Sequence, residues 1–315
     1  MWNPRVSPAT RFALLAAVVF TAGVVGFMPE ARAGDLLQLL RDELRPADES
    51  DGSGSQPASP PPAKNDSRRR QQNPPNSSNQ YCDSNGNCND DFSGSLFTAG
   101  AFLAGCVVAS PFVVPKRLLE DDYADRGYFP QFPYEADLPG YLMIDPWVPQ
   151  APRLWGGRLR GEYGDDFDSL SRIGGGLVLD TTLRVGLDTE FNYRYQNVGP
   201  GRRDSLWTGD ANLVFRFAQD EHWAMRSGVG FNWLADASDA NYGFNFTYAA
   251  DWFPVRPWIF STELDWGRLG PRALFHIRTT AGVQWHGVEA YTGYDYFDVG
   301  HFQSGGLIGG VRLWF

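Results

Sequence analysis

The sequence predicts an all-β fold, an antiparallel up-and-down barrel of about ten strands that crosses a membrane, over residues 153–315. Three observations predict it. Apolar and polar residues alternate with period two in segments separated by turn residues, as they do in strands with one apolar face. Aromatic residues stand near both ends of the apolar face, and the opposite face carries charges of both signs. Because alternation alone also fits a soluble barrel or sandwich, the aromatic and charge patterns decide.

The alternation can be followed strand by strand. In the segment 222–235, Met225 and Phe231 share one face, while Arg226 and Asn232 share the other. Boundaries taken from such patterns shift by a few residues, so counts of about eight or twelve strands are the alternatives to ten. The expected strands cover residues 154–164, 169–180, 182–196, 205–218, 222–235, 240–253, 257–267, 272–286, 287–297 and 302–315.

Aromatic residues on the apolar face lie at two levels. Trp223 and Trp233 are ten residues apart in one segment. At ~3.3 Å per residue and ~40° tilt, this spacing separates the rings by about 20–25 Å, close to the ~25 Å apolar band between the aromatic girdles of membrane barrels. The packing of a soluble protein core gives no reason for aromatic residues to gather at two separate levels along the strands. The residues assigned to these girdles are Trp155, Tyr163, Trp223, Trp233, Tyr242, Trp252, Trp258, Trp266 and Trp285.

The opposite face carries both arginines and carboxylates. Because a ten-stranded barrel is narrow, these side chains are expected to meet across the lumen and form ion pairs, with glycines making room. His276, beside Arg278 on this face, is expected to join the same network rather than to act as a base. The lumen-facing charged residues are expected to be Arg160, Glu162, Arg184, Asp188, Glu190, Arg194, Asp210, Arg216, Arg226, Asp251, Glu263, Asp265, Arg278, Glu289, Asp295 and Arg312.

The last eleven residues of the chain, GGLIGGVRLWF, form the final expected strand, with Val311, Leu313 and Phe315 in one row. This stretch resembles the C-terminal strand of Gram-negative outer-membrane β-barrels, in which a terminal Phe and alternating apolar residues are read by the barrel-assembly machinery. The resemblance covers residues 154–315 and identifies a class rather than a subfamily. It implies outer-membrane lipid as the surroundings and the assembly machinery as a partner.

The turns between the expected strands suggest an orientation. The first, third, fifth, seventh and ninth connections are mostly longer and polar, whereas the others are short. Membrane barrels of this kind have short periplasmic turns and longer external loops. An even number of strands puts both ends of the barrel on the periplasmic side, where the N-terminal extension is therefore expected, with the option of a periplasmic partner.

The chain before the barrel has four parts. Residues 1–33 are expected to be a secretory signal peptide, because basic residues precede a short apolar run and a small-residue cleavage site. Residues 34–46 form a short amphipathic helix, and residues 47–91 a disordered linker rich in Ser, Pro, Asn and Asp. In this linker, Cys82 and Cys88 are candidates for a disulfide, since export favours an oxidising compartment.

Residues 92–152 are expected to combine an apolar helix with an extended connector rich in Pro and aromatic residues. The helical part, 92–115, is uncharged. It is expected to lie against the mouth of the barrel or at the membrane surface, and an inner-membrane span is the alternative.

Composition excludes several functions. A net charge of −10 argues against a nucleic-acid partner. The three cysteines and four histidines show no zinc spacing, so no metal, cofactor or catalytic residue is expected.

The sequence thus predicts a structural or anchoring outer-membrane barrel with a narrow, charge-filled lumen. The alternatives are a narrow pore for small polar solutes and a secreted soluble β-barrel or sandwich that binds a ligand. The least favoured is an outer-membrane hydrolase. Its candidate residues would be Asp298 with His301, or Asp165, Asp166 and Asp168.

Overall fold

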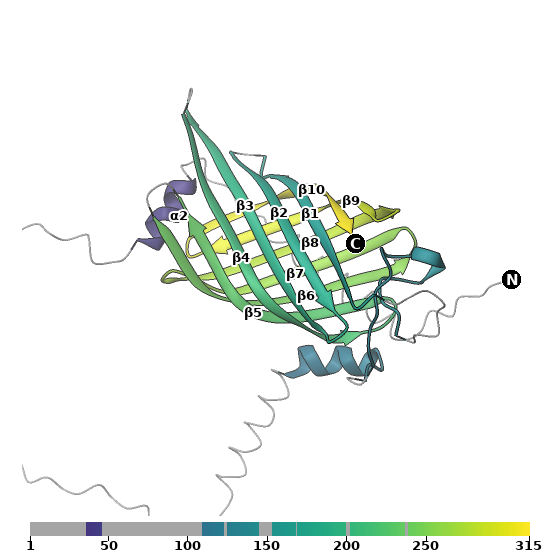
Figure 1. Ribbon diagram of the computed structural model, residues 1–315. Helices are drawn as coiled ribbons and strands as arrows, with labels where there is room; N and C mark the ends of the chain where they lie inside the picture. The colour runs from purple at the N-terminus through teal and green to yellow at the C-terminus, as the bar shows by residue number, and fades with distance from the viewer. Residues whose placement is uncertain are drawn as a thin grey trace, which may run out of the picture. The chain divides into compact units, whose positions relative to one another are not determined.

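The computed structural model describes residues 36–45, 109–122, 125–144, 153–167, 169–199, 202–236 and 239–315. In these residues, ten strands form one closed antiparallel barrel in which β1 pairs with β10 (Figure 1). The prediction of ten strands in up-and-down order is confirmed. The strands are β1 (Trp155–Asp165), β2 (Leu170–Thr181), β3 (Val185–Gly199), β4 (Arg202–Gln219), β5 (Trp223–Ala235), β6 (Ala240–Val255), β7 (Trp258–Leu269), β8 (Arg272–Trp285), β9 (Val288–Val299) and β10 (Phe302–Trp314).

Strand pairing aligns the alternating patterns of neighbouring strands. Glu190 on β3 is opposite Asp210 on β4, and Glu263 on β7 is opposite Arg278 on β8. Since side chains alternate between the two faces of a strand, this register turns every charged row to the inside and every apolar row to the outside.

The turns correct one expectation. The connections at both ends of the barrel are short, 166–169, 200–201, 236–239, 270–271 and 300–301 at one end and 182–184, 220–222, 256–257 and 286–287 at the other. The expected long connection after β3 is instead a continuation of the hairpin, because Asn197 pairs with Arg203. The tip of the β3–β4 hairpin therefore projects beyond the neighbouring strands at one end of the barrel only (Figure 1).

Helix α2 (Leu36–Leu44) lies in one mouth of the barrel. Leu37, Leu40 and Leu44 are buried against apolar residues at the strand ends. The residues that receive them are Leu170, Leu206, Leu234, Leu269, Leu274, Phe297, Val299 and Phe302. This is the mouth opposite the one at which β1 begins and β10 ends. The helix is thus on the other side of the barrel from the one expected for the N-terminal extension.

The connector before β1 closes the second mouth. Phe129, Tyr141 and Leu142 are buried against Phe253 and Trp314 at the strand ends. Backbone pairing between Tyr128 and Met143 ties the two arms of the connector together, and the short 3-10 helix η2 (Glu135–Asp137) lies between them. The expected extended connector is thus folded over the barrel.

A helix at residues 109–118 precedes this connector. The ring of Phe112 packs edge-on against Phe217 at 5.2 Å and Tyr248 at 6.0 Å, measured between ring centroids. Within the described residues, no helix is long and apolar enough to cross a membrane. The predicted signal peptide, the whole linker 47–91 and the Cys82–Cys88 pair within it lie outside the described residues.

Candidate functional site

The lumen holds the charged residues that alternation assigned to it. All sixteen predicted side chains are buried. Fifteen lie on strands, whereas Arg184 lies in the turn between β2 and β3, at the mouth that the connector closes. There its guanidinium donates two hydrogen bonds, of 2.7 and 2.6 Å, to the carboxylate of Asp121 just before the connector.

Three further charged residues of the lumen were missed by the sequence reasoning. Arg158, Arg172 and Asp180 are also buried and take part in ion pairs. The sequence could have predicted them. Arg158 is two residues before Arg160 on the same strand, so its side chain lies on the same, inward face. The row of inward-facing charged residues thus continues further toward the strand ends.

The centre of the lumen is organised around Glu190. Arg160 and Arg278 both donate hydrogen bonds to its Oε2 atom. Arg160 also lies 3.0 Å from Glu263, and Arg172 lies 2.8 Å from Glu162. The pair between Arg160 on β1 and Glu263 on β7 bridges strands far apart around the barrel, so the network crosses the lumen.

Glycines provide the room for this network, as expected. A Cβ atom at Gly176 would lie 2.8 Å from the Arg160 Nε atom, and one at Gly282 would lie 2.0 Å from the Glu289 Oε1 atom. Both contacts are too close for a side chain. Because these glycines have no side chain, they leave space for the large charged side chains beside them.

His276 belongs to the same network. Its Nδ1 atom lies 3.0 Å from Asp265 and its Nε2 atom 2.9 Å from Asp295. Because a carboxylate only accepts hydrogen bonds, a protonated ring would donate to both acids. His276 thus lies among the charged residues of the lumen, the place expected from the sequence.

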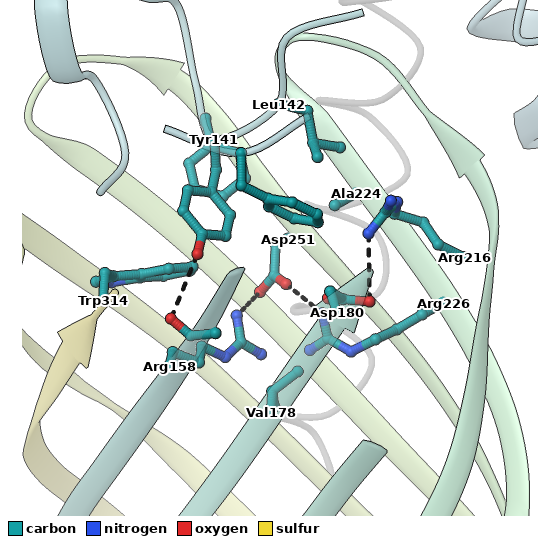
Figure 2. A pocket seen from close by; sticks show the side chains of 13 residues that line it. Tyr141, Leu142, Arg158, Val178, Asp180, Arg216, Ala224, Arg226, Asp251 and Trp314 are labelled. Carbon is teal, nitrogen blue, oxygen red and sulfur yellow. Dashed lines mark hydrogen bonds and ion pairs between the residues drawn. The ribbon is translucent and has the colours of Figure 1, made fainter. Parts of the chain in front are cut away.

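The end of the lumen below the connector has its own cluster, which Figure 2 shows. Asp251 accepts hydrogen bonds of 2.6 Å from Arg158 and 2.7 Å from Arg226, and Arg216 lies 3.3 Å from Asp180. Tyr141 of the connector points into this cluster and donates to the carbonyl of Gly157. The connector is thus joined to the lumen by a hydrogen bond as well as by packing.

The lumen holds equal numbers of basic and acidic side chains. The buried residues of the barrel include nine arginines and His276 against ten carboxylates. Among these described lumen residues, only Arg194 and Asp210 have no basic or acidic partner within 4.0 Å. Arg194 instead donates to Thr208 at 3.3 Å, with its guanidinium 4.3 Å from the ring centroid of Phe297, and Asp210 accepts from Asn212 at 2.9 Å.

The lumen contains two small cavities, each described here by its lining. One lies at the connector end and is lined by Arg158, Asp251 and Trp314 among others. The second includes Thr208, Asp210 and Phe297 in its lining and so lies beside Arg194, below α2. Each has room for about one or two water molecules. Buried side chains fill most of the interior of the barrel.

Helix α2 is held over this second cavity by polar contacts as well as by its leucines. The Arg41 Nη2 atom donates to Asp204 at 2.8 Å and its Nε atom to Asp236 at 2.6 Å. Hydrogen bonding to Asp204 raises the pKa of Arg41 above its ordinary value. Glu43 forms an ion pair of 2.7 Å with Arg272. Charged residues at the rim of this mouth thus pair with residues of opposite charge on the helix.

The outer wall carries the predicted aromatic residues. Trp223 and Trp252 are paired across β5 and β6 near the connector mouth and stack at 5.3 Å between ring centroids. Trp233 pairs with Tyr242 on the same strands toward the α2 mouth. Trp155, Tyr163, Trp258, Trp266 and Trp285 are exposed on the outer face.

The residues considered for catalysis have structural contacts. Asp298 accepts hydrogen bonds from Tyr296 at 3.0 Å and Gln303 at 2.9 Å, whereas His301 lies 3.9 Å from Glu43. Asp165 accepts from Tyr163, and Asp166 accepts from the backbone N–H groups of the first turn. Asp168 lies outside the described residues. Among the described residues, no group of three or more His, Cys, Asp or Glu side chains could hold a metal ion.

No family model matches the chain, and no curated protein matches it. Among solved structures, the chain is similar to one described as "KdgM porin", with 12% sequence identity and a TM-score of 0.23. The alignment covers 51% of this chain and 99% of that one.

Proposed function

We propose that the protein is an outer-membrane β-barrel with a closed lumen, which acts as a structural or anchoring element rather than as an open channel. The observation that carries the proposal is the filled lumen. Its central residues Arg160, Glu190 and Arg278 are at most 5% exposed, although they line the inside of a barrel. A water-filled channel would leave such groups exposed and unpaired.

The outer wall supports a membrane location. Large apolar side chains such as Leu213, Phe191 and Phe231 are 63%, 51% and 47% exposed on the outside of the barrel. An apolar surface of this extent is unfavourable in water but suits lipid. A closed barrel also satisfies all strand hydrogen bonds internally, which is the condition for strands in a bilayer. A soluble ligand-binding barrel would need the opposite arrangement, a polar outside and an open interior.

The last strand supports assembly as an outer-membrane barrel. Val311 and Leu313 are 44% and 45% exposed on the outer face, and Phe315 packs against Trp155 at 6.0 Å between ring centroids. This row is the one that resembles the signal read by the barrel-assembly machinery. The proposed orientation places the ends of the barrel and the connector in the periplasm. The longer β3–β4 hairpin then faces outward, as external elements do.

The test combines folding and conductance. Residues 34–315, refolded in detergent, are expected to migrate differently on a denaturing gel with and without boiling. Reconstituted in a planar bilayer, the folded form is expected to show no stepwise conductance. A protein that stays monomeric and soluble without detergent would contradict the membrane assignment, and regular conductance steps would contradict the closed lumen.

A narrow pore for small polar solutes is the second candidate. It is favoured by one observation, the cavity below α2 beside the unpaired Arg194 and Asp210. If α2 were removable, this cavity would face the external side. Conductance that appears only after deletion of residues 35–45 would favour the pore.

A further inference from the structure

Residues 112–118 form the last two turns of the helix that precedes the connector, and they pack on the outside of the barrel. The ring of Phe112 lies 5.2 Å from that of Phe217 on β4, measured between ring centroids. It lies 6.5 and 6.0 Å from the rings of Phe246 and Tyr248 on β6. These two residues point outward, since they alternate along β6 with residues that are buried in the lumen. The helix therefore lies against the outer wall and not in the lumen.

The chain is tied to the rim of the connector mouth directly after this helix. Glu120, with a φ of 53°, has the left-handed conformation in which helices commonly end. The carboxylate of Asp121 then accepts hydrogen bonds of 2.7 and 2.6 Å from Arg184, and one of 3.2 Å from the backbone N–H of Gln219. The two side chains of the ion pair are only 1% and 4% exposed. The helix thus runs along the wall toward the connector mouth and is fixed at both of its ends.

The strand register gives the depth at which Phe112 contacts the wall. Trp223 and Trp252 are paired across β5 and β6 and belong to the aromatic row near the connector mouth. Tyr248 lies four residues before Trp252 on the same face of β6, further from that mouth. At ~3.3 Å per residue and ~40° tilt, this separation is about 10 Å along the barrel axis. Because Phe112 packs on Tyr248, its ring lies well inside the level of the aromatic row.

The helix turns apolar side chains away from the barrel. Val113, Val114 and Leu118 are 41%, 49% and 48% exposed, whereas Phe112 is half-buried against the wall. From residue 112 to residue 118 a helix rises about 9 Å, which matches the depth between Tyr248 and the aromatic row. The exposed apolar side chains therefore lie at depths that a membrane around the barrel would cover.

The order of charges along the helix agrees with this depth. Residues 112–115 carry no charge, and the first charged residue is Lys116. Arg117, Glu120 and Asp122 follow and are exposed. Since a charged group is costly in the hydrocarbon of a bilayer, this order fits a helix whose first turn lies deeper than its end.

We propose that residues 112–118 are a membrane-interface helix, in which Val113, Val114 and Leu118 contact the acyl chains of the leaflet at the connector mouth. This inference rests on the proposed membrane location of the barrel. Lipid is the partner of this face because the face continues the apolar outer wall and lies at the same depth. Interfacial helices bury their apolar side about 5–10 Å into the boundary between headgroups and acyl chains. Arg117, near the shallow end, can reach the headgroups with its long side chain.

The collision rates of nitroxide labels test the proposal. The full chain, with its three cysteines replaced by Ser, is purified from membranes and reconstituted in phosphatidylcholine vesicles. Single labels are attached to the variants Val114→Cys, Leu118→Cys and Glu120→Cys. The variant Leu213→Cys is the control for the outer wall, where Leu213 is 63% exposed.

Oxygen is concentrated in lipid, whereas a charged nickel chelate stays in water. The ratio of oxygen to nickel collisions is expected to fall in the order 114, 118, 120, because the helix rises from the acyl chains toward the headgroups. Between 114 and 120 the ratio should differ by about threefold or more, since the two positions are about 9 Å apart along the chain axis. The ratio at 213 should be high.

The outcomes separate the helix from the barrel on which it rests. A low ratio at 114 and 118 with a high ratio at 213 would overturn the interface helix and leave the membrane barrel intact. Few collisions with either reagent at 114 and 118 would show that protein covers this face, and would also overturn the proposal. A ratio that rises from 114 to 120 would overturn the direction of the helix. If the label at 213 also collided mainly with nickel, the proposed membrane location itself would fail.

Discussion

The two mouths of the barrel are closed in different ways. The external mouth, in the proposed orientation, receives a nine-residue helix that is far from the barrel in sequence and is held by three buried leucines and a few rim ion pairs. The periplasmic mouth is closed by a connector that pairs with Arg153 just before β1, through Phe129, and packs aromatic rings on the strand ends. A short docked helix can detach without unfolding the barrel. The connector cannot move far from the strand to which it leads.

The largest effect is expected in the lumen that separates the mouths. Glu190→Gln removes the carboxylate to which Arg160 and Arg278 donate, and leaves two buried cations short of a counter-charge. Breaking a buried ion pair by removing one partner costs about 3–5 kcal/mol. The urea midpoint of the gel-shift transition should fall, whereas the exposed Glu221→Gln should not change it. An unchanged midpoint in Glu190→Gln would show that the network is not essential to the closed lumen.

The connector mouth should respond almost as strongly. Phe129 is 1% exposed and lies 5.4 Å from the ring of Tyr141. Phe129→Ala removes a fully buried ring, which typically costs about 3–5 kcal/mol. Because the connector pairs with Arg153 just before β1 and packs on the strand ends, the loss should appear as a lower free energy of unfolding of the whole barrel. Loss of the connector contacts with no change in barrel stability would contradict the distinction between the two mouths.

At the external mouth the same kind of change should act locally. Leu40→Ala removes a fully buried side chain of α2, at a cost of about 2–5 kcal/mol. If the helix detaches independently, protease cleavage at Arg41 should accelerate while the unfolding midpoint of the barrel stays the same. The neighbour Leu39 is 41% exposed, so Leu39→Ala is the matched control and should leave cleavage unchanged. A fall in the barrel midpoint in Leu40→Ala would mean that α2 is part of the folding unit.

The smallest effect is expected for the rim ion pairs. The side chain of Arg41 is 21% exposed and contacts Asp204 and Asp236. Arg41→Gln should weaken docking of α2 by about 1 kcal/mol, because water and salt screen pairs at a surface. The difference between this variant and the natural protein in cleavage after Leu39 or Leu40 by chymotrypsin, at sites that the substitution leaves in place, should shrink at high salt. A salt-independent difference would indicate lost packing rather than lost charge.

Much of the barrel could be predicted from the sequence because a strand in a membrane wall has two faces with different solvents. Each expected strand has an observed counterpart with bounds within three residues at either end, and the row of Arg160 and Glu162 is inside. Loop lengths were less predictable. The expected loop after β3 is strand because Asn197 and Arg203 continue the ladder, and this pairing depends on the partner strand rather than on turn residues.

The sequence could not predict which charged side chains form ion pairs within the lumen. Alternation turns Arg160, Glu190 and Arg278 inward, but their contacts depend on which strands face one another across the closed barrel. The same holds for Arg194 and Asp210, which bond to Thr208 and Asn212 because no oppositely charged side chain lies close enough. The alternation of apolar and polar residues thus determines whether a side chain faces the lumen or the outside. The closure of the barrel determines which other side chains it contacts across the lumen.

The sequence by itself determined the fold class, a strand number of about ten and the two faces of the wall, because these follow from local alternation and from the solvent on each side. The tertiary structure alone decided which mouth α2 occupies and how the connector closes the other. The leucines of α2 and the aromatic rings of the connector require apolar surroundings, which the sequence shows. Either mouth offers such surroundings. Only the packed shapes and the rim charges, Asp204, Asp236 and Arg272 at one end, distinguish them.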